Sequence, residues 1–264
     1  MRADLYLFNF GYVKSRQKAK SLIEEKYVKI NGVVIQKPSF EVNEEDDNVV
    51  EISDPCPYVS RGGLKLEKII TELNLDLNGK VAIDIGASTG GFTHCLILNG
   101  ASKVFAIDSG TSQLDSRLLD DERVISIEGY NARYLKIDDI GQLVDVITID
   151  VSFISQTLII PAASKLLSEN GVYISLIKPQ FEVGKGKIGK GGIVKDKKYR
   201  LEAVEGVIRS ASENGLYCYA LFESPIQGGD GNIEYIAAFS KTEKSLSPAF
   251  IKNLIITKRV KNEI

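Results

Sequence analysis

The sequence predicts an α/β protein whose parallel sheet opens a binding crevice at one edge. The first observation is the segment VAIDIGASTGGF at residues 81–92, in which an apolar strand runs into an acidic, glycine-rich turn. Two later apolar strands end in polar residues, Asp150 and Lys178. Because ligands bind beyond the carboxyl ends of parallel strands, these three strand ends are expected to face one crevice. The chain is therefore interpreted as an enzyme.

A basic segment precedes this sheet. Residues 1–37 contain eight lysines and arginines against three acidic residues, and an acidic cluster follows at residues 41–54. The whole chain has 33 basic and 35 acidic residues, so its net charge of −2 argues at first against a nucleic-acid partner. The uneven distribution of these charges instead predicts a small basic module that contacts nucleic acid.

Local patterns predict a small α+β module in this segment. Ser15 is a good N-cap for a helix, and the dipeptide Asn31-Gly32 is typical of a hairpin turn between two strands. The expected elements are helices at residues 4–11 and 16–25 and strands at 27–30 and 33–36. The second helix turns Arg16, Lys18 and Lys20 toward solvent, where they can meet phosphates. A basic helical face that is merely solvated would show the same pattern.

Prolines in residues 54–57 predict a stiff linker between this module and the rest of the chain. The expected division is a module at residues 1–54, a linker at 55–59 and a larger domain at 60–264. The elements expected in the larger domain are helices at 64–73 and 198–214, strands at 81–85, 103–108, 124–129, 146–150, 173–178, 217–223 and 234–240, and a final basic helix capped by Ser247.

The glycine-rich turn indicates which nucleotide the crevice binds. Ser88 takes the place of the middle glycine that a dinucleotide site needs, and the carboxylate of Asp84 would be costly beside a pyrophosphate. That carboxylate suits the cationic amino group of S-adenosylmethionine, Asp108 suits its ribose hydroxyls, and Asn131 suits its adenine edge. The expected cofactor site comprises Asp84, Gly86, Ala87, Ser88, Gly90, Gly91, Phe92, Asp108, Asn131 and Asp150. An α/β fold with incidental glycines is the alternative.

Other features of the sequence exclude several classes of protein. There is no signal-peptide pattern and no apolar run of about 18 residues that could span a membrane. The three cysteines lack disulfide or metal spacing, which fits a reducing, cytoplasmic compartment. His94 is the only histidine, so histidine triads and histidine-rich metal sites are excluded, and no metal is expected. His94 itself is interpreted as a bystander.

Several motifs in order resemble known families. The stretch SRQKAKSLIEEKYVKINGVVIQKPSFEV resembles the S-four (S4) RNA-binding domain, with departures at Ala3 and at residues 25–26, where a glycine commonly ends the second helix. The segments YVSRGGLKLE, DIGASTGGFT, IDVSFIS, IKPQFEVGKGKIGKGGIVKD and SPIQGGDGNIEY resemble the TlyA family. This family, historically called hemolysins, is described as ribosomal RNA 2′-O-methyltransferases with an FtsJ-like catalytic domain.

The resemblance implies a Rossmann-like sheet, mostly parallel with an antiparallel last strand, that binds S-adenosylmethionine and methylates ribosomal RNA, with cytidine as the expected nucleoside. It also implies a catalytic tetrad at Lys65, Asp150, Lys178 and Glu234. The reaction needs a base to remove the ribose 2′-hydroxyl proton, and a lysine can do this only if its pKa falls from ~10.4 toward 7 or 8. Lys178 is assigned as that base, with Lys65 beside it and the two carboxylates orienting the ammonium groups.

The same reasoning marks the residues expected to contact RNA. A glycine-rich basic loop at residues 185–192 could close over the substrate backbone or be an ordinary surface loop. Phe153 could stack on the target base or fill the core. The expected RNA contacts are Arg2, Ser15, Arg16, Lys18, Lys20, Arg61, Lys185, Lys187 and Lys190.

Three other functions compete with this interpretation. A membrane-acting hemolysin needs a spanning helix, a closed barrel or strongly amphipathic helices. A non-catalytic RNA-binding factor could retain the methyltransferase fold. Methylation of a base or of a protein side chain is the alternative within the enzymes, although the loop at residues 150–153, DVSF, departs from the Asn-Pro-Pro-Tyr type of many amino-group methyltransferases.

Overall fold

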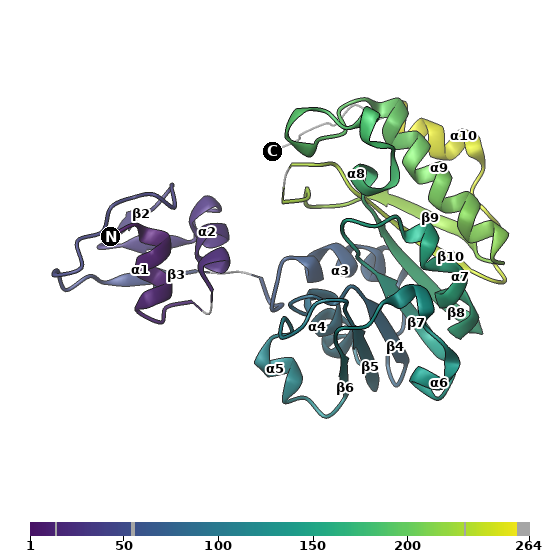
Figure 1. Cartoon of the computed structure of the whole chain (residues 1–264), viewed down its shortest axis with the longest axis horizontal. Helices are drawn as coiled ribbons and strands as arrows, with labels where there is room; N and C mark the ends of the chain where they lie inside the picture. The colour runs from purple at the N-terminus through teal and green to yellow at the C-terminus, as the bar shows by residue number, and fades with distance from the viewer. Residues whose placement is uncertain (14, 54–55, 230, 258–264) are drawn as a thin grey trace. The chain divides into compact units, whose positions relative to one another are not determined.

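The computed structural model describes residues 1–13, 15–53, 56–229 and 231–257, which form two compact units, Met1–Pro57 and Tyr58–Ile264 (Figure 1). Residues 54 and 55 of the expected linker lie outside the described residues, as do the last seven residues of the chain.

The N-terminal unit packs two helices on a small antiparallel sheet. Helices α1 (Ala3–Asn9) and α2 (Arg16–Glu24) bury Leu7 and Ile23 against the strands. The sheet has the order β2-β1-β3, with β1 at Val28–Ile30, β2 at Val33–Val34 and β3 at Val50–Ile52. The expected hairpin is present, because Asn31 (φ 52°) and Gly32 (φ 76°) both adopt the left-handed conformation that such a turn requires.

Two features of this unit need a physical explanation. Strand β3 was not predicted, because it lies in the acidic segment and its three residues are recruited by backbone pairing with β1, Val28 opposite Ile52. At the end of α2, Lys26 adopts φ 63°, the left-handed conformation that glycine occupies at no steric cost. The turn that ends α2 therefore has the left-handed conformation usual for glycine, and Lys26 adopts it at some conformational cost.

The larger unit contains a seven-stranded sheet of order β6-β5-β4-β7-β8-β10-β9. Strands β4 to β8 are parallel to one another, and β10 runs antiparallel to both β8 and β9, as the resemblance implied. The bounds are β4 (Val81–Ile85), β5 (Lys103–Ile107), β6 (Val124–Ile127), β7 (Val144–Ile149), β8 (Leu167–Ile177), β9 (Tyr217–Glu223) and β10 (Tyr235–Ser240).

Helices cover both faces of this sheet. Alternate strand residues such as Ile83 and Ile85 share one buried cluster with Val204 and Val207 of α9 (Lys197–Glu213). Helices α3 (Gly62–Leu73) and α4 (Gly91–Leu98) contact each other and pack on the sheet from the opposite side. The remaining α-helices are α5 (Ser116–Leu119), α6 (Ile137–Ile140), α7 (Ile160–Ala163), α8 (Pro179–Glu182) and α10 (Pro248–Lys252). No helix within the described ranges is long and apolar enough to cross a membrane.

The antiparallel pairing of β10 determines where its first residue lies. Tyr235, at the start of β10, pairs with Ile177, at the end of β8. Glu234 and Lys178, the neighbours of these two residues, are thereby brought to the same edge of the sheet. The carboxyl ends of β4 and β7 lie at this edge as well, because both strands run parallel to β8.

Candidate active site

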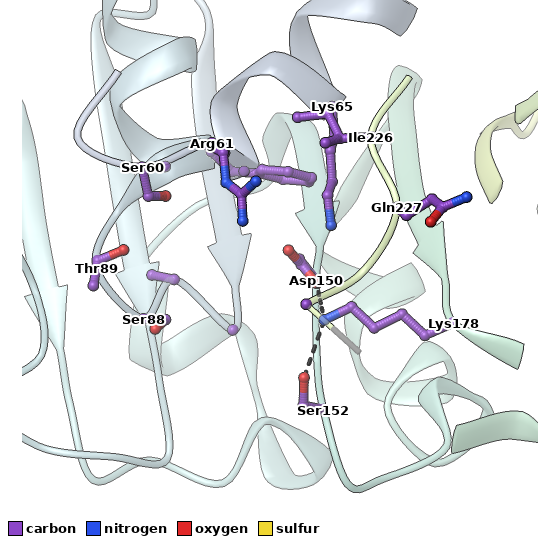
Figure 2. A pocket seen from close by; sticks show the side chains of 16 residues that line it. Ser60, Arg61, Lys65, Ser88, Thr89, Asp150, Ser152, Lys178, Ile226 and Gln227 are labelled. Carbon is purple, nitrogen blue, oxygen red and sulfur yellow. Dashed lines mark hydrogen bonds and ion pairs between the residues drawn. The ribbon is translucent and has the colours of Figure 1, made fainter. Parts of the chain in front are cut away.

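A pocket of about 310 Å³ opens at this edge of the sheet, between α3, the turn after β4 and the ends of β7 and β8 (Figure 2). Its size is at the lower end of the range found for small-molecule sites. The lining residues are Ser60, Arg61, Gly62, Lys65, Gly86, Ala87, Ser88, Thr89, Gly91, Phe92, Asp150, Ser152, Lys178, Ile226, Gln227 and Gly229. The sequence predicted nine of these as site residues.

The glycines of the turn permit close approaches that shape the pocket. Gly86 has φ 82°, and a Cβ added there would lie 2.3 Å from the carbonyl oxygen of Asp150. A Cβ added at Gly91, the first residue of α4, would lie 2.3 Å from Oγ of Ser60. Glycine at these two positions therefore lets the turn press against the loop after β7 and lets α4 press against the segment before α3.

Asp84 lies outside the pocket, beneath the turn. Its carboxylate is fully buried and accepts hydrogen bonds from Oγ1 of Thr93 (2.7 Å) and Oγ1 of Thr148 (2.8 Å). Burial raises the pKa of Asp84 to about 6, because the ionised form loses its hydration. In this structure Asp84 joins β4 to α4 and β7 through these two hydrogen bonds, and it does not line the pocket.

Three further residues of the expected cofactor site are absent from the pocket lining. Asp108 accepts hydrogen bonds from the backbone amides of Ser88 (2.8 Å) and Gly110 (2.7 Å), so its carboxylate organises the two turns that follow β4 and β5. Asn131 is exposed and caps a short helical turn by accepting from the amide of Arg133. Gly90 is the left-handed N-cap of α4, with φ 94°.

The pair Lys178 and Asp150 lies in the pocket. Nζ of Lys178 is 2.5 Å from Oδ1 of Asp150 and donates a hydrogen bond to Oγ of Ser152 at 3.0 Å. Both members of the ion pair are largely buried, with 13% and 20% of their side chains exposed. Figure 2 shows Lys178 directed at the loop after β7, where the two oxygens hold its amine.

The pair Lys65 and Glu234 forms the second half of the expected tetrad. Nζ of Lys65 is 2.6 Å from Oε2 of Glu234, and the glutamate is buried behind the pocket wall. Lys65 lines the pocket itself and extends from α3 toward Asp150 (Figure 2). The fold therefore brings the four residues to one edge of the sheet as two ion pairs, with both lysines and Asp150 on the pocket surface.

Phe153 lies just beyond the loop that holds Lys178. Its side chain is 92% exposed, and its ring centroid is 5.1 Å from that of Phe181. Its φ of 64° is rare for a residue with a bulky side chain and costs conformational energy. The exposure excludes the core interpretation of Phe153.

The basic residues expected to contact RNA in the larger unit have different surroundings. Arg61 lines the pocket. Lys185 and Lys190 are exposed on the short helical turns η4 (Lys185–Lys187) and η5 (Lys190–Gly192). Lys187 pairs with Glu202 and lies over the ring of Tyr199.

In the N-terminal unit, two arginines converge on one buried carboxylate. Nε of Arg2 and Nε of Arg16 lie 2.9 and 2.8 Å from the oxygens of Asp4, while their side chains stay about half exposed. These contacts hold the pKa of Asp4 at about 2, against the opposing effect of burial. Ser15 caps α2 by accepting from the amide of Lys18, and on this helix Lys20 is exposed and Lys18 is partly buried.

His94 has a structural role at the start of the larger unit. Its Nδ1 accepts a hydrogen bond from the backbone amide of Val59 at 3.1 Å, which requires the neutral ring. Burial lowers the pKa of His94 and so favours that neutral form.

The sequence interpretation missed the pocket residues that come from irregular segments. No role was predicted for Ser152, although its place two residues after Asp150, just beyond the end of a strand, indicates a position at the same edge of the sheet. No site residue was predicted in the segment SPIQGG at residues 224–229, which supplies Ile226, Gln227 and Gly229 to the pocket lining. Ser60, Gly62 and Thr89 complete the missed residues.

Comparison with known proteins agrees with this geometry. The sequence pattern of the FtsJ-like methyltransferases matches residues 58–241, and that of the S4 domain matches residues 1–48. A relative named hemolysin A, from Brachyspira hyodysenteriae, is 41% identical over 240 residues, which cover 90% of this chain and 99% of that protein.

Two further comparisons cover almost the whole chain. A Mycobacterium tuberculosis protein named 16S/23S rRNA (cytidine-2′-O)-methyltransferase TlyA is 37% identical over 96% of this chain and 95% of its own. A solved structure from Streptococcus thermophilus, whose name assigns it to the hemolysins, has a TM-score of 0.78 at 39% identity and covers 97% of this chain and 94% of its own. The chain therefore belongs to the FtsJ-like methyltransferase family, in the TlyA and hemolysin A group that joins this catalytic domain to an N-terminal S4 domain.

Proposed function

We propose that this enzyme transfers a methyl group from S-adenosylmethionine to a ribose 2′-hydroxyl of ribosomal RNA, with a cytidine as the target nucleoside. The observation that carries the proposal is the pair of lysines, each held by a carboxylate, in one pocket beside the glycine-rich turn. The name of the M. tuberculosis relative supports the ribosomal target and the cytidine.

The pocket contains the polar groups that S-adenosylmethionine requires. The hydroxyls of Ser88 and Thr89 and the first turn of α4 offer donors to its carboxylate, and the carboxylate of Asp150 offers a partner for its amino group. When bound, the cofactor supplies a methyl group on a positively charged sulfur, which needs no further activation. The pocket wall thus offers hydrogen-bond donors for the carboxylate of S-adenosylmethionine and an acceptor for its amino group, which supports this choice of cofactor.

The chain's own residues then handle the hydroxyl and its proton. As the ribose oxygen forms its bond to the methyl carbon and the bond from that carbon to sulfur breaks, Lys178 accepts the hydroxyl proton; for this its ammonium group must first release a proton to solvent. Asp150 and Ser152 hold this amine in position, and Glu234 holds Lys65 at the opposite wall, where its charge can bind the ribose or a phosphate.

RNA recognition is proposed to involve both units. Arg2 and Arg16, which Asp4 holds in place, and the lysines of α2, of which Lys20 is exposed, suit contacts with phosphates. Such contacts give affinity without sequence preference. In the larger unit, Arg61 and the exposed Lys185 and Lys190 would contact the strand that carries the target nucleotide. The exposed ring of Phe153 could stack on a base there.

Mass-spectrometric mapping of ribose methylation tests the proposal. Ribosomal RNA from the native host is compared with RNA from a deletion strain and from the deletion strain complemented with Lys178→Ala. We expect one or more 2′-O-methylcytidines to be lost in both altered strains and restored by the wild-type gene. A complete set of ribose marks in the deletion strain, or a lost mark on a base, contradicts the proposal. Leakage of liposomes caused by the purified protein would instead support the membrane activity that the name hemolysin suggests.

A further inference from the structure

The side chain of Asn232 joins two loops, one of which supplies residues that line the pocket. It is 1% exposed. Its Oδ1 accepts a hydrogen bond from the backbone amide of Val194 at 3.0 Å, and its Nδ2 donates to the carbonyl oxygen of Gly192 at 3.0 Å. Both partners belong to the end of the segment 184–194, here called the lysine loop, which carries Lys185, Lys187 and Lys190.

The backbone of Asn232 belongs to the other loop, which forms part of the pocket wall. Its carbonyl oxygen accepts a hydrogen bond from the amide of Gly228 at 2.9 Å. Gly228 in turn lies directly against the carboxylate of Glu234, because an added Cβ would come within 2.6 Å of Oε1. Its neighbours Gln227 and Gly229 line the pocket. Asn232 thus connects the lysine loop to the wall that supports the tetrad.

The lysine loop is open to solvent around most of its glycines. A Cβ added at Gly184, Gly186, Gly191 or Gly192 would meet no atom within 4 Å. Val194, at the end of the loop, is buried in a small cluster with Val183 and Ala203. In the middle of the segment, Ile188 packs against the same cluster and Lys187 pairs with Glu202. The two hydrogen bonds from Asn232 fix its C-terminal end.

We propose that Asn232 is a positioning residue, which holds the lysine loop to the pocket wall so that Lys185 and Lys190 contact the phosphates of the RNA substrate. This inference rests on the proposed function, because it assigns the lysine loop to RNA. A buried amide that both donates and accepts is suited to this task, since it satisfies one group of each kind in the loop backbone. A free loop would have to be ordered at each binding event, at a cost in conformational entropy.

Asn232→Asp provides the sharpest test, because the variant keeps the shape and the acceptor for Val194, while its ionised form replaces the donor to Gly192 by an oxygen that repels that carbonyl. We expect KM for ribosomal subunits lacking the modification to rise about tenfold, which corresponds to the loss of about one hydrogen bond to the loop. The turnover number kcat and the affinity for S-adenosylmethionine should change less than twofold. Asn214→Asp is the matched control, because Asn214 makes the same kind of bond, to the carbonyl of Ser210, at the far end of α9.

A double-mutant cycle separates positioning from general destabilisation. Replacing Lys185 and Lys190 together by alanine should raise KM at least tenfold in the wild-type protein and should have almost no further effect in Asn232→Asp. An equal effect in both backgrounds would overturn the inference, as would a fall in kcat at unchanged KM in the single variant.

Hydrogen exchange supplies a readout that does not depend on activity. In the full-length Asn232→Asp variant, amides of residues 184–194 should exchange at least tenfold faster than in the wild type, with β4 and β7 unchanged. Unaltered exchange in this segment would refute the anchoring role. Faster exchange together with a wild-type protein that does not methylate ribosomal subunits would refute the proposed function and leave the anchor in place.

Discussion

The buried carboxylate of Asp84 should weaken the fold at neutral pH, and Asp84→Asn should remove that weakness. Burial raises the pKa of Asp84 from 3.8 to about 6. At 1.36 kcal/mol per pKa unit, keeping this group ionised in the folded state costs about 3 kcal/mol above pH 6. The asparagine is neutral at every pH, and its amide can accept from one of the two threonine hydroxyls that bind Asp84 and donate to the other.

The sign of the pH dependence follows from proton binding. Between pH 3.8 and about 6 the folded state holds the Asp84 proton more tightly than the unfolded state, so the contribution of Asp84 to wild-type stability falls as pH rises through this range. The stability of Asp84→Asn relative to the wild type should therefore increase by about 1.4 kcal/mol between pH 5 and pH 8. Urea unfolding followed by far-ultraviolet circular dichroism measures this difference, with the exposed Asp120→Asn as control. A difference that stays constant or shrinks over this range refutes the reasoning.

Three further predictions concern residues around the site. Gly86→Ala should lower both the melting temperature and the rate of methyl transfer, because the added Cβ would meet the carbonyl of Asp150. The control Gly79→Ala has a similar φ but open space around it, so it should lose only about 1 kcal/mol of folding stability and keep full activity. In calorimetry, the stability of His94→Gln relative to the wild type should increase as pH falls below about 6.5, because the wild-type folded state requires the neutral ring and the glutamine does not titrate. A difference that stays constant with pH would contradict this. Phe153→Gly should melt at an unchanged or higher temperature, because glycine adopts its φ without strain, and a large drop would show that the ring supports the fold.

Much of the site was predictable because strand ends can be recognised locally. Asp150 and Lys178 follow apolar runs directly, and the parallel arrangement of those runs places both at one edge of the sheet. Glu234 was harder, because its position depends on the antiparallel pairing of β10 with β8, which only the resemblance supplied.

Other features depend on contacts that no local pattern specifies. Asp84 ends up beneath the turn because side chains alternate along β4, so that Ile83 and Ile85 face α9 while Asp84 faces the opposite side. Gln227 reaches the pocket from an irregular loop that is tied at Asn232 to Gly192 and Val194, about 40 residues earlier in the sequence. Strand β3 forms only because β1 offers it a backbone partner.

Single-turnover methyl transfer by Lys178→Ala tests whether Lys178 is the base that accepts the hydroxyl proton. Purified wild-type and variant proteins are mixed with radiolabelled S-adenosylmethionine and ribosomal subunits lacking the modification, and cofactor binding is measured separately by calorimetry. Lys80→Ala serves as control, since Lys80 also faces an aspartate, Asp145, but precedes β4 and lies away from the pocket. If Lys178 is the base, we expect Lys178→Ala to bind the cofactor with an affinity close to that of the wild type and to transfer the methyl group about 100-fold to 10,000-fold more slowly. Transfer at the wild-type rate would contradict the assignment of Lys178 as the base.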